Sequence, residues 1–150
     1  MSSGRFDNQI PARHQASGES TERSTVPMPA AKDLGTRSDL LKFAAANATV
    51  AGLWLEFGVY KGRSLRKIAA QTQNEVFGFD SFEGLPEDWV LSYRKGDFSL
   101  KGQLPANFPP NVTLVKGLFS ETLPVFLGTH TEPVAFLHID CDLYHSTQTI

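Results

Sequence analysis

The chain has 150 residues, of which 41% are apolar and 20% are charged, and its formal net charge is −2. This length allows one domain of ordinary size, and the near balance of charge argues against binding to nucleic acid or to an anionic membrane surface. The sequence shows neither the run of about 20 apolar residues that spans a bilayer nor the apolar core of a signal peptide, so we expect a cytoplasmic protein. Its one cysteine, Cys141, cannot form an internal disulfide, which agrees with a reducing compartment.

The N-terminal segment, residues 1–35, is rich in Ser, Arg, Thr, Pro and Gly and has neither helical nor strand periodicity. We therefore predict a disordered N-terminal tail, followed by one domain over residues 36–150. A helix is expected to begin after Thr36, whose hydroxyl can cap it, with Asp39 in the first turn. We expect one face of this helix to pack on a sheet. The apolar residues of that face are Leu40, Leu41, Ala44, Ala45 and Ala48.

Four apolar segments are predicted to be β-strands. They are residues 53–57, 76–80, 112–116 and 134–139. A helix over residues 64–71, with Leu65, Ile68 and Ala69 facing inward, is expected between the first two strands, and a short helix from Ser120 to Leu127 is expected between the last two. Strands that alternate with helices predict an α/β fold with a parallel, Rossmann-like sheet and right-handed crossovers.

A long connection, residues 81–111, separates the second and third predicted strands and contains too many Gly and Pro residues for a sustained helix or central strand. It also carries large apolar side chains that would be costly to leave in water. These are Phe82, Leu85, Trp89, Tyr93, Phe98 and Phe108. We therefore expect a partly ordered lid.

Ligands of parallel α/β sheets bind outside the C-terminal ends of the strands. Glu56, Asp80, Lys116–Gly117 and Asp140 occupy four such ends, so we expect them to meet at one crevice. Asp80 follows Gly58 by 22 residues, close to the spacing of about 20 between the glycine turn and the ribose-binding acid of nucleotide-binding folds. The pattern G-x-G-x-x-G is absent because bulky residues follow Gly58, which disfavours a pyrophosphate and favours S-adenosylmethionine, a ribose-containing ligand without phosphate.

Four motifs extend this argument. They are residues 55–64 (LEFGVYKGRS), 78–86 (GFDSFEGLP), 115–119 (VKGLF) and 137–147 (LHIDCDLYHST). In this order they resemble the macrocin O-methyltransferase family of class I S-adenosylmethionine-dependent methyltransferases. The resemblance implies methylation of a hydroxyl on a small metabolite, such as a natural-product sugar. Members continue with a further strand and paired acids that complete a magnesium site, whereas this sequence stops at Ile150, so we expect the N-terminal part of such a domain, as a fragment or a truncated product.

The expected cofactor site draws on the turn after the first strand, the start of the lid and the later strand ends. Its residues are Glu56, Gly58, Tyr60, Gly62, Ser64, Asp80, Ser81, Phe82, Gly84, Gly117 and Asp140. Asp80 is expected to accept both ribose hydroxyls, with capping of its own loop as the alternative. The resemblance implies that Glu56 helps to hold the methionine amino group, and its alternative is a structural role in which it accepts backbone N–H bonds of the following turn. Phe82 is expected to stack on the adenine or to lie in the core, and Lys116 is expected to be a solvated charge.

Asp140 and Asp142 decide the reaction type. Asp140 is expected to be the first Mg²⁺ ligand, and Asp142 a second ligand or the catalytic base, since a hydroxyl attacks a methyl sulfonium faster once its proton is removed. The alternative for Asp142 is the N-cap of a helix that begins at Leu143. His138 is interpreted as a core residue rather than a base, and Cys141 is not expected to be a nucleophile, because neighbouring carboxylates raise the pKa of a thiol.

Two other functions stay open. A nicotinamide-dependent oxidoreductase is opposed by the glycine spacing, and a non-catalytic truncated fragment would expose an unpaired sheet edge. The expected partner is a small hydroxylated acceptor, and homo-oligomers are also considered.

Overall fold

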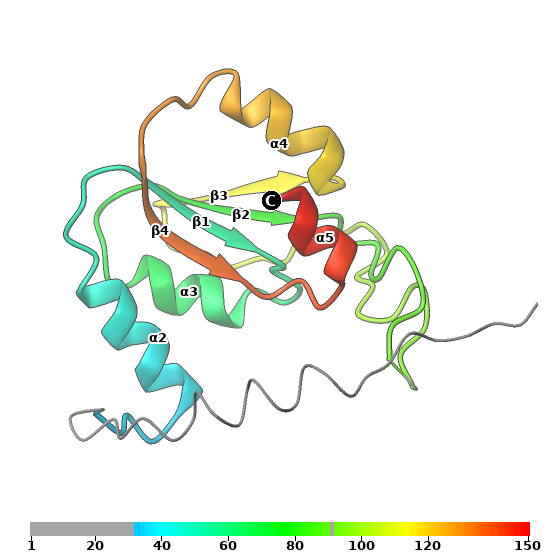
Figure 1. Cartoon of the computed structure of the whole chain (residues 1–150), viewed down its shortest axis with the longest axis horizontal. Helices are drawn as coiled ribbons and strands as arrows, with labels where there is room; N and C mark the ends of the chain where they lie inside the picture. Colours follow the sequence, from blue (N-terminus) through cyan, green and yellow to red (C-terminus); the bar gives the residue numbers. More distant parts are fainter. Residues whose placement is uncertain (1–31, 91) are drawn as a thin grey trace, which may run out of the picture. The chain divides into compact units, whose positions relative to one another are not determined.

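The sheet of this protein has four parallel strands in the order β3-β2-β1-β4 (Figure 1). The computed structural model describes residues 32–90 and 92–150. The strands are β1 (Leu53–Phe57), β2 (Val76–Asp80), β3 (Val112–Lys116) and β4 (Val134–Ile139). All four lie at the predicted bounds, and the α/β, Rossmann-like fold is confirmed. The chain adds β2 and β3 on one side of β1 and then β4 on the other, so the strand order reverses between β1 and β4, where such sheets bind ligands.

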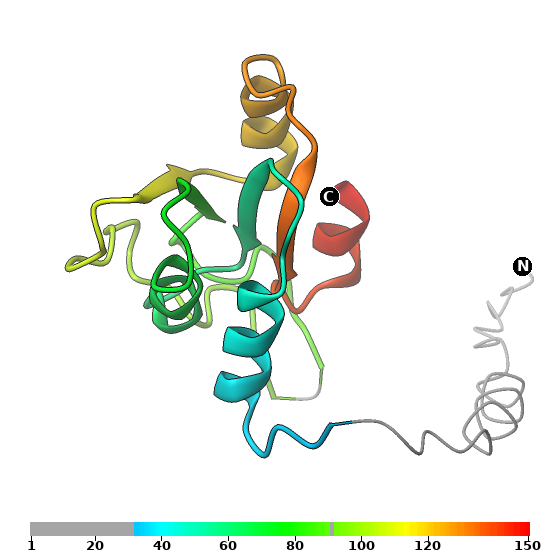
Figure 2. The same ribbon diagram turned by 90° about the vertical axis from the view of Figure 1, so that its left-hand side faces the viewer.

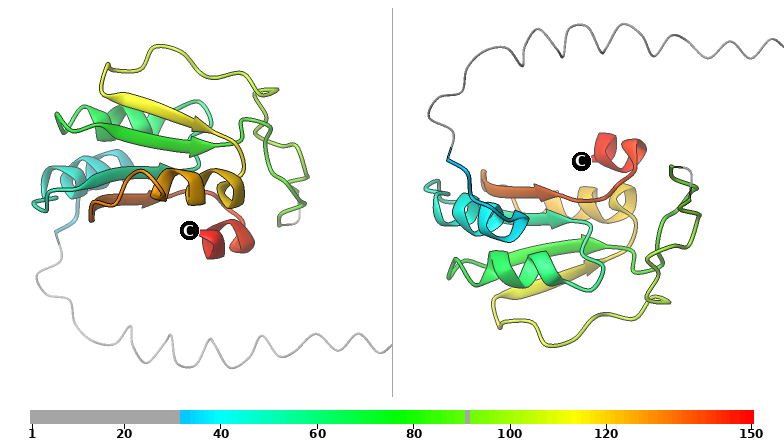
Figure 3. Two further views of the ribbon diagram at one scale, coloured as in Figure 1. Left: turned by 90° about the horizontal axis from the view of Figure 1, so that it is seen from above. Right: turned by 90° about the horizontal axis from the view of Figure 1, so that it is seen from below.

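Helices cover both faces of the sheet. They are α2 (Arg37–Ala46), α3 (Arg63–Ala69), α4 (Phe119–Leu127) and α5 (Tyr144–Thr149). Figure 2 shows α2 and α3 on one face and α4 on the other, and the two views of Figure 3 show the same separation, with α5 on the side of α4. Each predicted helix is therefore present, with ends within one or two residues of the expected ones.

Helix α2 begins as the sequence predicts, but it packs differently. The Thr36 hydroxyl accepts a hydrogen bond from the Asp39 amide at 3.1 Å. Only Leu41 and Ala45 are buried, whereas Leu40 is 56% exposed and Ala44 is also exposed. The expected face is therefore confirmed only for Leu41, Ala45 and Ala48, which join the core layer on this side of the sheet. The helix packs mainly beside α3, along the narrow i, i+4 stripe that one helix presents to another.

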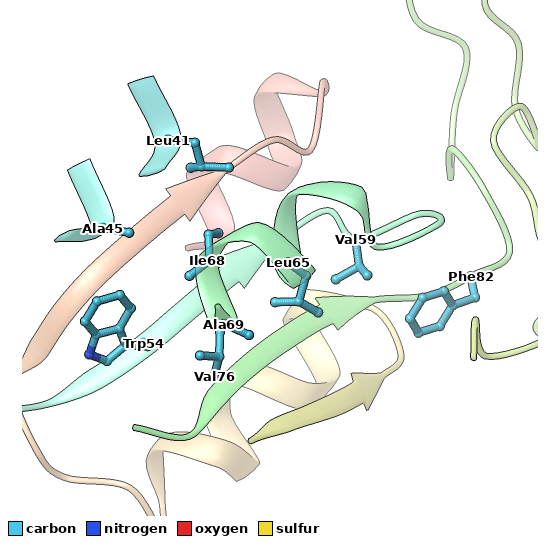
Figure 4. Packing of buried hydrophobic residues seen from close by; sticks show 9 residues of the cluster. All are labelled: Leu41, Ala45, Trp54, Val59, Leu65, Ile68, Ala69, Val76 and Phe82. Atoms are coloured by element: carbon cyan, nitrogen blue, oxygen red, sulfur yellow. The ribbon is translucent and has the colours of Figure 1, made fainter. Parts of the chain in front are cut away.

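The core consists of two layers, one on each face of the sheet. On the α2 and α3 side, the inward residues of α3, Leu65, Ile68 and Ala69, pack on Trp54 and Val76 (Figure 4). On the α4 side, Phe residues of β1 and β2 pack against Leu123 and Phe126. Every residue of β1 is buried, as expected for a central strand covered on both faces.

The described residues of the connection 81–111 form no helix or strand, as predicted, and yet backbone hydrogen bonds order them. The amides of Leu100 and Gly102 both donate to the Phe82 carbonyl, and Leu85 exchanges hydrogen bonds with Gly96 and Asp97. Phe82 and Leu85 are buried. The connection is therefore a folded loop with its own anchors in the core.

The predicted N-terminal tail falls almost entirely on residues 1–31, outside the described residues. In the part of the chain that the structure describes, no helix has the length and apolar character needed to cross a membrane.

Candidate functional site

A cleft of about 1320 Å³ lies at the C-terminal ends of the strands, with walls from the segments that follow all four of them. Most of the predicted site residues line it. They are Gly58, Tyr60, Ser64, Asp80, Ser81, Gly84, Gly117, Asp140 and Asp142. The predicted convergence of four strand ends is therefore present in the fold. Glu56, Gly62 and Phe82 do not line this cleft.

Gly58 brings the ends of the two central strands together at the base of the cleft. Its amide donates to the Phe79 carbonyl at 2.9 Å, and the Asp140 amide donates to the Phe57 carbonyl at 2.8 Å. With φ at 92°, a Cβ on Gly58 would lie 2.1 Å from the Asp140 carbonyl oxygen. Only glycine allows this approach of backbone to backbone.

Asp80 is the centre of a hydrogen-bond network that holds the turn after β1. Its Oδ2 accepts the amides of Val59 at 2.8 Å and Tyr60 at 2.7 Å, and its Oδ1 accepts the Phe82 amide at 2.8 Å. A carboxylate offers about four acceptor positions, so these bonds leave room for about one more. The alternative role, capping of its own loop, is therefore present together with support of the turn, and the expectation that Asp80 accepts ribose hydroxyls stays a prediction.

Glu56 is completely buried, and its carboxylate is paired with a histidine of the neighbouring strand. Glu56 and His138 are partners in the β1–β4 register, and His138 Nδ1 lies 3.0 Å from Glu56 Oε1. Burial raises the pKa of Glu56, while the hydrogen bond with His138 opposes this rise. Its Oε2 has no hydrogen-bond partner among the described residues. Glu56 does not line the cleft, and the structural role expected as its alternative is not seen either, because the Val59 and Tyr60 amides of the following turn donate to Asp80. His138 is partly buried in β4, as expected for a core residue.

Phe82 and Gly62 do not line the cleft, but they pack beneath its walls. Phe82 is 1% exposed and packs in the core. Of its two expected roles, the structure therefore shows the core position and not the stacking surface for adenine. Gly62, the N-cap of α3, has φ at 73°, and a Cβ there would lie 2.3 Å from the Phe108 ring. Lys116, expected to be a solvated charge, donates from its Nζ to the Gly102 carbonyl at 2.6 Å and so anchors the connection.

Arg66 ties the same connection to the start of α3. Its guanidinium donates to the carbonyls of Lys61 and Gly62 on one side and of Ala106 and Asn107 on the other. The guanidinium also lies 4.2 Å from the centre of the Phe108 ring. No pattern in the sequence predicts this clamp, because it joins residues about forty positions apart.

Asp140 and Asp142 stand on the β4 side of the cleft. Arg37, at the start of α2, donates from Nη2 to Asp140 Oδ2 at 2.5 Å. Partial burial and the nearby Asp140 carboxylate raise the pKa of Asp142, and Arg37 lowers it. No side chain caps α5, so the proposed N-cap role of Asp142 is wrong. Asp142 instead has φ at 62°, a left-handed conformation that is strained for a residue with a side chain and recurs at functional sites.

Two further reactive side chains, Cys141 and His145, lie in this region, and Cys141 lines the cleft. Burial, together with Asp142 and Asp140, raises the pKa of the Cys141 thiol, as predicted, despite its hydrogen bond to Thr147. His145 lies on the exposed side of α5 and is 3.1 Å from Glu87 Oε1 in the connection.

Several residues that line the cleft were missed by sequence reasoning. They include Arg37, Lys61, Arg63, Lys67, Phe98, Phe119 and Ser146. Lys61, Arg63 and Lys67 gather around the start of α3 and give that wall a positive charge, whereas Arg37 pairs with Asp140 on the β4 side. Although Lys61, Arg63, Phe119 and Ser146 lie within the quoted motifs, their place in the cleft depends on tertiary packing, which no periodicity predicts.

The described residues contain no group of three or more His, Cys, Asp or Glu side chains placed to bind a metal ion. The predicted magnesium site is therefore limited, in this part of the chain, to the carboxylates of Asp140 and Asp142.

Comparison with known proteins gives a family and a fold. A family model described as a methyltransferase domain matches residues 55–150. No curated protein matches the sequence significantly. The crystal structure of CalS11, described as a calicheamicin methyltransferase, aligns with 98% of this chain and 77% of its own at 23% identity and a TM-score of 0.60. The structure of the O-methyltransferase NovP aligns with 75% of this chain and 56% of its own at 23% identity and a TM-score of 0.53. The chain thus spans about three quarters of the first of these structures and little more than half of the second, and both share its fold.

Proposed function

This chain belongs to the methyltransferase domain family, and on that premise we propose that its cleft binds S-adenosylmethionine for transfer of the methyl group to a hydroxyl of a small metabolite, such as a natural-product sugar. The observation that carries the proposal is the meeting of four strand ends in one cleft at the reversal of strand order, with Gly58 and Asp80 at its base. The bulky residues after Gly58 oppose a dinucleotide, and the size of the cleft, about 1320 Å³, exceeds what the cofactor alone requires. The surplus volume is available to an acceptor.

The cofactor would lie along the wall formed by the turn after β1 and the start of the connection. Asp80 has about one acceptor position left for a ribose hydroxyl, and Ser81, next to it, lines the same wall. Lys61 and Arg63 line the cleft at the start of α3, where their charges favour the methionine carboxylate. Gly84 and Gly117 also line the cleft, and the backbone of Gly117 would serve the adenine edge.

The acceptor hydroxyl would face Asp142. In the transfer, the hydroxyl oxygen forms a bond to the methyl carbon, the carbon–sulfur bond breaks with its electron pair going to sulfur, and the proton goes to the Asp142 carboxylate. A raised pKa makes this carboxylate a better base at neutral pH. The reaction needs no covalent intermediate, because alignment of oxygen, carbon and sulfur in a closed site supplies most of the acceleration.

Two adjacent carboxylates opposed by one guanidinium fit part of a site for Mg²⁺, which takes few carboxylates and keeps water ligands. Asp140 and Asp142 would hold the ion, and Arg37 would have to release Asp140. When bound, Mg²⁺ would supply polarisation of the acceptor hydroxyl. Without Mg²⁺, the Asp142 carboxylate would be the base that takes the proton of the acceptor hydroxyl.

A thermal-shift titration with S-adenosylhomocysteine and with NADH tests the proposal. S-adenosylhomocysteine at about 100 times its Kd should stabilise the chain by about 2.7 kcal/mol, and NADH should have no effect. Asp97→Asn, at a position outside the cleft, is the control and should respond as the wild type does. Stabilisation by NADH alone would contradict the proposal and favour the oxidoreductase, whereas a chain without a cooperative transition would favour the non-catalytic fragment.

A further inference from the structure

Helix α5 follows the segment that carries the two candidate catalytic carboxylates, and its packing on the core is confined to its ends. Leu143, just before the helix, is 4% exposed, and Ile150, just after it, packs against the core layer on the α4 side. None of the 6 residues of α5 is buried. A helix this short is not stable on its own, so contacts with other parts of the chain decide how firmly it is held.

One such contact joins α5 to the connection. His145 Nδ1 lies 3.1 Å from Oε1 of Glu87, and both side chains are exposed. A neutral imidazole with its proton on Nδ1 donates to the carboxylate, and an imidazolium ion does so as well, so either charge state of the ring allows this contact. Both views of Figure 3 show α5 beside the outer part of the connection. The contact between Glu87 and His145 is here called the α5 strap.

The α5 strap joins two walls of the cleft that have different parts in the proposed function. On the connection side, residues 84–86 line the cleft directly before Glu87. On the α5 side, Asp142 and Ser146 line it, one before and one after His145. The connection wall is the one along which the cofactor would lie, and the α5 wall carries the proposed base. The strap is therefore the place where one wall can act on the other.

The connection end of the strap is the firmer of the two. Leu85, two residues before Glu87, is buried, and its amide donates to the Asp97 carbonyl at 2.9 Å. On the other side of Glu87, the Asp88 carboxylate accepts the Lys95 amide at 2.9 Å. Glu87 therefore lies between two anchored residues, whereas its partner belongs to a helix without buried side chains.

Asp142 is the residue whose placement the strap would affect. It lies three positions before His145, and the Leu143 amide donates to the Cys141 carbonyl across it at 2.6 Å. Its φ of 62° is a strained value for a residue with a side chain, and such values persist only where the surrounding structure fixes them. A change in how α5 is held therefore changes how the proposed base is presented to the cleft.

We propose that Glu87 and His145 are positioning residues, which couple binding of the cofactor at the connection wall to the placement of Asp142 on the opposite wall. The inference rests on the proposed function. A cofactor packed against residues 81–86 would restrain the connection, and the strap would pass this restraint to α5. The acceptor hydroxyl would then meet an ordered base once the cofactor is in place. An exposed ion pair shifts an equilibrium by at most about fivefold, which is enough to change the order of a helix that buries no side chain.

Amide hydrogen exchange, followed by NMR with and without S-adenosylhomocysteine, tests the coupling. The probe is the Thr147 amide, which donates to the Leu143 carbonyl inside α5. In the wild type, saturating S-adenosylhomocysteine should slow its exchange about three- to fivefold. In Glu87→Ala and His145→Ala this factor should fall below about twofold. It should persist in Glu87→Gln and His145→Asn, which keep an acceptor oxygen and a donor nitrogen at the contact.

Arg94→Ala is the matched control. It breaks another exposed ion pair of the same connection, between Arg94 and Asp88, and leaves the bond from the Lys95 amide to Asp88 in place. Its response to S-adenosylhomocysteine should equal that of the wild type. The urea midpoints of all these variants should stay close to the wild-type value, because the altered side chains are exposed. Alanine also favours a helix more than histidine does, so a lost response in His145→Ala cannot come from helix propensity.

The outcomes separate the two proposals. If S-adenosylhomocysteine binds but slows the Thr147 amide equally in the wild type and in both alanine variants, or does not slow it in the wild type, the coupling is overturned and the proposed function stands. A response lost equally in Glu87→Gln and Glu87→Ala also overturns the coupling, because the strap needs only an acceptor oxygen. Failure of S-adenosylhomocysteine to bind the wild type overturns the proposed function and the coupling with it.

Discussion

Substitution of Asp80 by alanine should destabilise the fold before any effect on a ligand is considered. The change removes the acceptor of three backbone amides, those of Val59, Tyr60 and Phe82. The Val59 and Phe82 amides are partly buried, and each would lose its partner at a cost of about 1–3 kcal/mol, whereas the exposed Tyr60 amide can bond to water. The expected loss is therefore about 2–6 kcal/mol, a large fraction of the total of about 5–15 kcal/mol for a domain.

Urea unfolding of the wild type and Asp80→Ala, without ligand, measures this loss. Asp97→Asn is the matched control, because Asp97 accepts a single exposed amide, that of Arg94, and asparagine keeps one acceptor oxygen. The control should change the free energy of unfolding by less than about 0.5 kcal/mol. If Asp80→Ala also stays within that margin while its affinity for S-adenosylhomocysteine collapses, Asp80 is a ligand-binding group and its role as the support of the turn is refuted.

Three further predictions concern residues around the cleft. Because its pKa is raised, Glu56 keeps its proton in the native state at pH values above about 4.5, where the unfolded chain has released it. The stability of the wild type should therefore decline with rising pH up to the native pKa. Glu56→Gln should lack the part of this decline that Glu56 causes, as measured by the calorimetric Tm from pH 5 to 8. Parallel Tm profiles of the wild type and the variant would contradict this prediction. Gly62→Ala should lower the free energy of unfolding in urea by about 2–4 kcal/mol, because the alanine would adopt a left-handed conformation and its Cβ would displace the Phe108 ring. An unchanged urea midpoint would exclude this clash. Arg66→Lys should speed amide hydrogen exchange at Ala106, Asn107 and Phe108, because one ammonium cannot donate to four carbonyls. Unchanged exchange at these amides would show that the clamp is dispensable.

Strands β1 and β2 could be predicted from the sequence because burial on both faces makes each one a short, nearly continuous apolar run. Strands β3 and β4 are only partly buried, but their Val, Ile, Thr and Phe residues favour a strand as well. The helix that α2 forms could also be predicted, from Thr36 and Asp39 at its start. Its packing could not, because the apolar face of an amphipathic helix fits a neighbouring helix as well as a sheet. Only contact with α3 selects Leu41 and Ala45 over Leu40 and Ala44.

The location of the site follows from the same logic, since polar residues that end parallel strands meet at one edge of the sheet. The pairing of Glu56 with His138 had a signal in the sequence. Each is a lone polar residue near the end of an apolar strand, and the reversal of strand order makes those two strands neighbours. The Arg37 contact had none, because it joins residues 103 positions apart through the packing of α2. The ring contacts of Tyr60 and Tyr93 with Phe98 likewise depend on a loop whose path no periodic pattern predicts.

Asp80 and Asp140 look alike in the sequence, as acids that follow apolar strands, but their neighbours give them different properties. The strand beside β2 is β1, whose glycine turn presents two amides to Asp80, and the start of the connection presents a third. Asp140 follows the edge strand β4, and its carboxylate instead meets the exposed guanidinium of Arg37. An exposed ion pair contributes about 0–1 kcal/mol, so a ligand or a cation can displace Arg37 at little cost. Displacement of amides that are partly buried costs several times more. The Asp140 carboxylate, after β4, can therefore change partners during a reaction cycle, while the Asp80 carboxylate, at the end of β2, keeps the turn in place.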